Sequence, residues 1–310
     1  MNDFAGQRDA LADVVAIPVS PFDADDRLDT DAYAALLRRL LTAGVRTLTP
    51  NGNTSEFYSL TPAERRAEVE LTVEAVDSAV AAAAGPRAQI IAGVGQEVPT
   101  AVAAARHARD AGANMVMVHQ PVHPYVSQDG WVDYHRAIAE AVPELGVVPY
   151  IRNPLIDGGA IARLGDSCPN VVGVKYAVPD PVRFATVARD AGLDRFVWVA
   201  GLAELYAPAY FACGATGFTS GLVNVSPEVS LEMLRALNAG DYPAAMKAWD
   251  LIRPFEELRA AQQSANNVTV VKEALAALGL CRRDVRPPSS HLDEPGRAAV
   301  ATILEGWELR

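Results

Sequence analysis

The chain of 310 residues is 50% hydrophobic, which is enough for a large core in two domains or in one barrel with an appendage. Its net charge of -11 argues against nucleic acid or an anionic membrane surface as the main partner, although local arginines could still bind a small anionic substrate. The chain has three widely separated cysteines, no signal-peptide pattern and no apolar run near the roughly 20 residues that span a bilayer, so we expect a cytoplasmic protein without disulfides.

Short apolar runs alternate with longer, alanine-rich helical patterns along most of the chain. The predicted strands are 14–19, 45–49, 89–94, 115–119, 147–151, 171–175, 196–200 and 216–220. The predicted helices between them are 29–41, 61–84, 99–111, 129–141, 156–166, 181–191 and 203–213. The start of the second helix is the most complete, because a threonine cap is followed by proline and then by Glu64 three residues on.

Eight evenly spaced strand–helix units without a long unstructured loop predict a (β/α)8 TIM barrel. A doubly wound sheet is the alternative, but no G-x-G-x-x-G sequence follows the first strand. After Pro227 the strand pattern stops, and helices are expected at 228–237, 243–261, 268–278 and 295–308. We therefore assign residues 1–225 to the barrel and residues 226–310 to a C-terminal helical region packed on it.

Lysine is rare in this chain, since only three of the 27 basic residues are lysines. Lys247 and Lys272 lie in helical patterns that are compatible with solvent, whereas Lys175 ends a β-branched run typical of a buried parallel strand. Burial would lower the pKa of Lys175 and provide a neutral amine for attack on a carbonyl. A strand-end lysine that reaches solvent or pairs with a carboxylate is the alternative.

In a (β/α)8 barrel the active site lies at the C-terminal ends of the strands, where this chain has several polar residues. Tyr150 ends one strand, and its hydroxyl could carry protons to and from an imine on Lys175, unless it only packs at the barrel rim. The turn at 52–55 offers N–H groups and hydroxyls to a carboxylate, although it could be an ordinary strand–helix turn. We expect Glu56 to anchor this turn, and the spacing of the five histidines indicates no metal site.

These motifs together resemble the dihydrodipicolinate synthase / N-acetylneuraminate lyase family of class I aldolases and dehydratases. The resemblance begins at segment 17–22, Ile-Pro-Val-Ser-Pro-Phe, and extends into the C-terminal helices. Segment 52–56, Gly-Asn-Thr-Ser-Glu, is similar to the family's G-x-T-G-E turn. This similarity implies that Asn53 and Thr54, with the neighbouring Ser55, bind the carboxylate of a 2-oxo acid.

Three further motifs follow in the order that the family has. Tyr150 matches the tyrosine of the family's Y-N-x-P segment, and Val172-Gly173-Val174-Lys175 matches its G-x-K segment. The match implies that Lys175 is the Schiff-base lysine and that Tyr150 is catalytic. Segment 214–217 with Ser220 resembles the family's glycine-rich eighth strand, which implies a substrate contact for Ser220.

Departures from the family pattern help to choose a subfamily. Ser55 stands where the family usually has glycine, and Leu155 replaces an arginine that the synthase uses for its aldehyde substrate. His123 replaces a tyrosine that the synthase borrows from a neighbouring subunit. In contrast, Arg152 and segments 254–259 and 285–288 are similar to the 5-dehydro-4-deoxyglucarate dehydratases.

The resemblance implies a Schiff-base lyase that dehydrates a deoxy-oxo sugar acid without a cofactor. Arg152, His123 and Ser220 would then contact the distal end of the substrate, and the arginine could bind a second carboxylate with two hydrogen bonds. The family also implies a homodimer or homotetramer. Two alternatives stay open, namely a pyruvate-dependent aldolase or synthase and a non-catalytic sugar-acid binding protein.

Overall fold

The computed structural model describes residues 4–82 and 85–308, which cluster into two compact units. The first unit comprises Met1–Val15, Arg46–Thr49 and Gln89–Thr219, and the second comprises Ala16–Val45, Pro50–Ala88 and Ser220–Arg310. No helix within the described ranges is long and apolar enough to cross a membrane.

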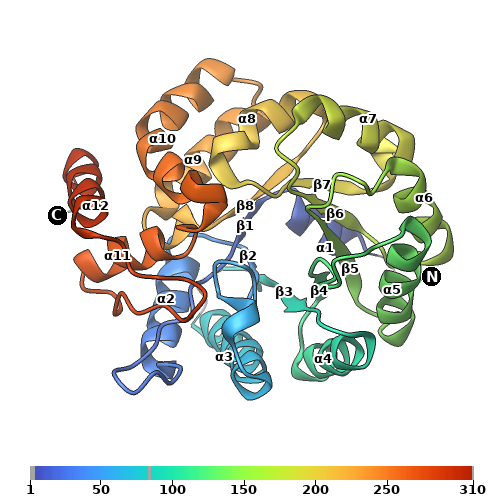
Figure 1. Ribbon diagram of the computed structural model, residues 1–310, viewed down its shortest axis with the longest axis horizontal. Coiled ribbons are helices and arrows are strands. Elements are labelled where there is room, and N and C mark those ends of the chain that lie inside the picture. Colours follow the sequence, from blue (N-terminus) through green and yellow to red (C-terminus); the bar gives the residue numbers. More distant parts are fainter. Residues whose placement is uncertain (1–3, 83–84, 309–310) are drawn as a thin grey trace. The chain divides into compact units, whose positions relative to one another are not determined.

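The strands form a closed parallel barrel in the order β1 to β8, as the alternating sequence pattern predicts (Figure 1). The strands are β1 (Val14–Ala16), β2 (Thr47–Leu48), β3 (Gln89–Val94), β4 (Met115–Val118), β5 (Gly146–Ile151), β6 (Gly173–Tyr176), β7 (Val197–Ala200) and β8 (Gly217–Ser220). Helices of the same unit follow β3 to β7 in turn: α4 (Val98–Ala111), α5 (Gln128–Ala141), α6 (Gly158–Ser167), α7 (Pro181–Ala191) and α8 (Ala203–Cys213).

The predicted β1 is three residues too long, because the chain leaves the ladder after Ala16. Pro18 has no N–H to donate, so it cannot continue a regular strand. Ile17 N–H still donates to the Ser220 carbonyl at 2.9 Å. The other strands agree with the prediction to within about two residues at each end, the usual uncertainty of such boundaries.

A short N-terminal helix, α1 (Ala5–Leu11), was not predicted from the sequence. Its Leu11 is buried in the hydrophobic cluster of the barrel interior. Glycine is required at the start of β8, because a Cβ on Gly217 would lie 2.0 Å from the Leu11 carbonyl oxygen. A Cβ on Gly173, at the start of β6, would lie 2.7 Å from Leu11 Cδ1. The two glycines therefore make room for α1 at the N-terminal ends of these strands.

The second unit is mainly helical. Its helices are α2 (Thr30–Thr42), α3 (Pro62–Ala81), α9 (Pro227–Asn238), α10 (Tyr242–Ser264), α11 (Thr269–Ala277) and α12 (Glu294–Gly306). The capping box predicted for α3 is present, since Thr61 and Glu64 each accept from the other's backbone N–H. The backbone of α10 leaves the helical region at Ala261, where the sequence predicts its end. The domain boundary at residue 225 stays a prediction.

Candidate active site

Lys175 and Tyr150 occupy paired positions on neighbouring strands. In the parallel pair of β5 and β6, the Cα atoms of these two residues are direct partners. Side chains alternate between the two faces of a strand, so paired residues on parallel strands point to the same face. The Lys175 Nζ atom lies 4.6 Å from the centre of the Tyr150 ring. The structure thus brings the two predicted catalytic residues together.

The Lys175 side chain is buried without an acidic partner. The residue is 3% exposed, and no carboxylate of the described residues forms an ion pair with it. Burial lowers the pKa of Lys175 from 10.5 to about 7, because an ammonium group loses its hydration inside the protein. A large fraction of the amine is therefore neutral at pH 7, as attack on a carbonyl requires. The alternative of a lysine that reaches solvent or pairs with a carboxylate is excluded.

Tyr150 packs in the interior of the first unit. It belongs to a buried cluster with Met117, Val148 and Val199, which limits its motion. The ring of His119 stands edge-on to it, with the two ring centres 6.2 Å apart. His119 directly follows β4 and is fully buried. The sequence predicts His119 at a strand end, and the structure adds its contact with the Tyr150 ring.

The predicted carboxylate-binding turn lies in the second unit. Ser55 N–H and Phe57 N–H both donate to the Gly52 carbonyl, at 3.1 and 3.3 Å, and Glu56 N–H donates to the Asn53 carbonyl at 3.0 Å. These bonds form a tight turn in which Thr54 makes no hydrogen bond to the described residues. The turn therefore leaves the N–H and hydroxyl of Thr54 available to a ligand.

Ser55 supports the turn from inside. Its hydroxyl donates to the Pro18 carbonyl at 2.6 Å and accepts from Gly52 N–H at 3.2 Å. Ser55 does not have a positive φ, so serine fits this position without the backbone strain that would favour glycine. The single hydroxyl proton of Ser55 is used in its hydrogen bond to the Pro18 carbonyl oxygen. Asn53 and Thr54 are therefore better candidates for donating hydrogen bonds to a substrate carboxylate.

Glu56 anchors the end of the turn, as the sequence predicts. Its carboxylate pairs with Lys272 on α11 and accepts from Arg286 N–H at 2.9 Å. Lys272 is 0% exposed, so the expectation of a solvent-compatible lysine is wrong. Its ammonium group also donates to the Asp284 carbonyl at 2.7 Å and lies 4.0 Å from the centre of the Phe22 ring. The ion pair with Glu56 therefore has the further hydrogen bonds that a buried charge needs.

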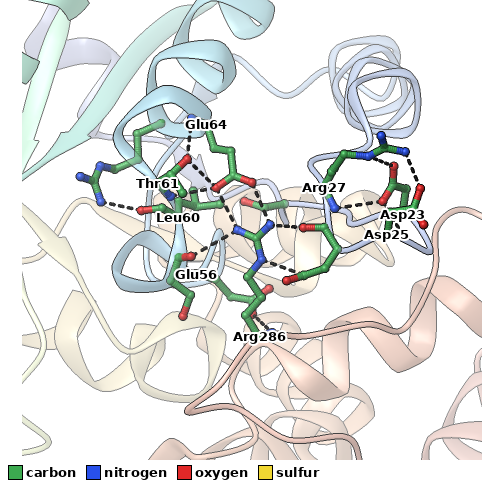
Figure 2. Close-up of polar contacts among 12 residues, drawn as sticks. Asp23, Asp25, Arg27, Glu56, Leu60, Thr61, Glu64 and Arg286 are labelled. Carbon is green, nitrogen blue, oxygen red and sulfur yellow. Dashed lines mark hydrogen bonds and ion pairs between the residues drawn. The ribbon is translucent and has the colours of Figure 1, made fainter.

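Arg286 lies in the segment that follows α11 and binds Glu64 in the first turn of α3. Figure 2 shows its guanidinium facing Glu64, with Nη1 and Nη2 at 2.9 and 2.8 Å from the two carboxylate oxygens. The hydrogen bonds from Arg286 lower the pKa of Glu64 to about 2. Arg259, in the other segment that resembles the dehydratases, pairs with Glu256 at 2.6 Å in a buried position. Both arginines thus support the second unit through internal ion pairs.

The remaining predicted site residues lie in different surroundings. Ser220 is buried, and its hydroxyl accepts from Val223 N–H at 2.9 Å. His123 lies on the exposed loop after β4, where its Nδ1 accepts from Tyr125 N–H at 3.1 Å. Arg152 is exposed after β5, and its backbone N–H donates to Gln120. Within residues 4–82 and 85–308 neither His123 nor Arg152 bonds to Lys175, so their substrate contacts stay predictions.

No group of three or more His, Cys, Asp or Glu side chains among the described residues could hold a metal ion. The chemistry available at the Lys175–Tyr150 pair is that of an amine and a phenol. A buried lysine beside a tyrosine in a (β/α)8 barrel, with no ion pair to a described carboxylate, is an arrangement suited to carbonyl chemistry.

The model of the dihydrodipicolinate synthetase family matches residues 10–306, and the chain belongs to this family. The match confirms the resemblance seen in the sequence motifs. The chain is therefore a lyase, and the alternative of a non-catalytic binding protein is not supported.

Curated relatives match nearly the whole chain. A probable 5-dehydro-4-deoxyglucarate dehydratase from Rhizobium rhizogenes is 32% identical over 309 residues, covering 98% of each chain. Another from Rhodococcus opacus is 33% identical over 296 residues, covering 94% of each. Among solved structures, the dihydrodipicolinate synthase from Bacillus clausii is 38% identical with a TM-score of 0.91, over 97% of this chain and 99% of that one. The dihydrodipicolinate synthase from Oceanobacillus iheyensis is 34% identical with a TM-score of 0.91, and the match covers 99% of this chain and 100% of that one.

Proposed function

We propose that the chain is a Schiff-base-forming dehydratase that acts on a deoxy-oxo sugar acid such as 5-dehydro-4-deoxyglucarate. The observation that carries this proposal is the buried Lys175 amine, unpaired with any described carboxylate, 4.6 Å from the Tyr150 ring. The two curated relatives, each named a probable 5-dehydro-4-deoxyglucarate dehydratase, support the choice of substrate.

In the proposed reaction, the neutral amine of Lys175 attacks the carbonyl carbon of the 2-oxo acid. The carbinolamine loses water to form an iminium ion, which withdraws electrons from the adjacent carbon. A proton leaves that carbon, and the hydroxyl group on the next carbon takes up a proton and departs as water. A water molecule then hydrolyses the imine and frees the Lys175 amine. Tyr150 is the proposed proton carrier for these steps, because its ring lies beside the amine and a phenol can both donate and accept.

Other residues are proposed to bind the substrate. Asn53 and Thr54 would hold the carboxylate next to the carbonyl, with Ser55 supporting their turn from inside. Arg152 would bind the distal carboxylate, since its exposed guanidinium can form two parallel hydrogen bonds with a carboxylate. His123 and Ser220 are further proposed contacts at the distal end. We also propose that the protein acts in the cytoplasm as a homodimer or homotetramer.

A pyruvate-dependent synthase or aldolase is the second candidate. The two solved structures named dihydrodipicolinate synthase, 34% and 38% identical to this chain, favour it. Leu155 argues against it, because this position resembles that of the arginine that the synthase uses for its aldehyde substrate. A coupled assay of pyruvate condensation with an aldehyde distinguishes the two candidates.

The first test is borohydride reduction followed by intact-mass measurement, with pyruvate, 5-dehydro-4-deoxyglucarate and sialic acid offered separately. We expect a mass increase that maps to Lys175 and is largest with the dehydratase substrate. The Lys175→Ala variant should give no adduct, and Lys247→Arg, which changes an exposed lysine, should react like the wild type. An adduct of unchanged yield in Lys175→Ala would disprove the proposed nucleophile.

A further inference from the structure

Glu68 is a fully buried acid in the second unit whose carboxyl group reaches both ends of the turn. It lies on α3 and is 0% exposed. Its Oε2 accepts from Asn51 N–H at 3.3 Å, at the start of the turn. Its Oε1 forms a hydrogen bond with the Ser20 hydroxyl, which in turn donates to the Ser55 carbonyl at 2.6 Å. The two proposed carboxylate-binding residues lie between these two attachment points.

The number of protons in this chain of contacts favours a neutral Glu68. A serine hydroxyl has one proton, and a carbonyl oxygen can only accept. The proton of Ser20 is therefore needed for its bond to the Ser55 carbonyl. The contact between Ser20 and Glu68 then needs a second proton, which the acid form of Glu68 supplies. An ionised Glu68 would compete with the Ser55 carbonyl for the single serine proton.

The surroundings of Glu68 agree with this count. Burial raises the pKa of Glu68 to about 8, and the nearby Glu56 carboxylate adds to the increase. The contact with Ser20, the hydrogen bond from Asn51 N–H and the charge of Lys272 on α11 lower the pKa and so act in the opposite direction. From α2, Tyr33 reaches this region with a neutral hydroxyl, whose own pKa burial raises further. The acid form of Glu68 therefore predominates at neutral pH.

We propose that Glu68, in its neutral acid form, is a positioning residue that holds Asn51 and Ser55 so that the residues between them present their donors to the substrate carboxylate. The ligand in this proposal rests on the proposed function. Ionisation of Glu68 at alkaline pH removes the donor to Ser20 and releases the Ser55 carbonyl. The turn then becomes mobile, and substrate binding weakens before the fold is lost.

The experiment compares the wild type with Glu68→Gln between pH 6 and 9.5. A glutamine amide donates to Ser20 and accepts from Asn51 N–H, but it does not ionise. In the wild type, substrate binding depends on the acid form of Glu68, whose fraction falls tenfold per pH unit once the pH is well above the pKa. We therefore expect the wild-type KM to rise by up to tenfold per pH unit above about pH 8. For Glu68→Gln, KM should stay nearly constant. The titration of the free Lys175 amine should appear in kcat/KM of both proteins near pH 7, below the range in which Glu68 ionises, and serves as an internal control.

Hydrogen exchange gives a readout that does not depend on the reaction. After correction for intrinsic rates, exchange of the amides at 51–57 should accelerate above about pH 8 in the wild type but not in Glu68→Gln. Ser20→Ala, which removes the bridge to Ser55, should exchange rapidly at every pH. Equal pH dependence of exchange in the wild type and Glu68→Gln would overturn the proposal. If the exchange differs as expected but no borohydride adduct forms, the positioning role stands and the proposed function fails.

Discussion

Lys175 and Tyr150 are direct partners across two parallel strands, and the lysine Nζ lies 4.6 Å from the centre of the tyrosine ring. Because both side chains project from regular strands, their relative position is set by strand pairing. A site built on paired strands is held more firmly than one on loops, which favours a reproducible geometry for proton transfer.

Replacement of Tyr150 by phenylalanine should slow imine formation by about 10²- to 10⁴-fold, the usual contribution of a general acid–base group. The ring that packs over Lys175 is retained, so the substrate affinity and the fold should change little. Rapid-mixing kinetics with borohydride trapping measures the rate. Tyr125→Phe, at a residue that is 85% exposed, is the matched control. A Tyr150→Phe enzyme as fast as the wild type would exclude the hydroxyl from proton transfer.

Replacement of Lys175 by methionine should make the protein more stable below pH 7. In the unfolded chain the Lys175 amine has a pKa of 10.5, whereas burial in the folded protein lowers this pKa to about 7. The unfolded state thus binds more protons between these values, and wild-type stability rises with pH by up to ~1.4 kcal/mol per unit. The advantage of Lys175→Met should therefore be largest below pH 7 and shrink above it. Urea unfolding at several pH values tests this, and an advantage independent of pH would contradict it.

Replacement of Lys272 by methionine should destabilise the protein by about 3–5 kcal/mol, because it leaves the buried Glu56 carboxylate without its cation. The turn that Glu56 anchors should then exchange its amide hydrogens faster. The exposed Lys247→Met is the control and should change the free energy of unfolding by less than about 0.5 kcal/mol. If the two variants unfold at the same urea concentration, the ion pair contributes no net stability.

Replacement of Glu64 by glutamine should destabilise the protein by about 1.5–3 kcal/mol at pH 7, the usual worth of hydrogen bonds to charged groups. Arg286 lowers the folded pKa of Glu64 to about 2, so this stability is present above pH 4.5 and is lost as the pH falls through 2. The difference between wild type and variant should therefore disappear in acid. The exposed Asp25–Arg27 pair in Figure 2 provides the control, and Asp25→Asn should have little effect.

The sequence predicted the features that depend on local pattern. The strand before Lys175 and the capping box at Thr61 are set by residues within a few positions of each other, and both were predicted correctly. The identity of the barrel followed from the repetition of such local units.

Features that depend on distant partners were missed. Lys272 lies in an ordinary helical pattern, and the carboxylate that pairs with it in its buried position is that of Glu56, 216 residues earlier in the chain. Glu68 likewise occupies a helix in which glutamate is common, and its role depends on Ser20, 48 residues away. Residue types alone do not tell which face of a helix meets which loop, so these contacts required the three-dimensional structure.

The fit of Leu11 against Gly173 and Gly217 has a consequence for synthesis on the ribosome. The Asp13 carbonyl, just before β1, accepts from Phe218 N–H of β8 at 3.2 Å. During synthesis, β1 can therefore pair with β8 only after more than two-thirds of the chain has been made. Contacts of such long sequence separation form late and slow the folding of a domain. Until β8 emerges, β1 has an open edge, which invites pairing with other chains.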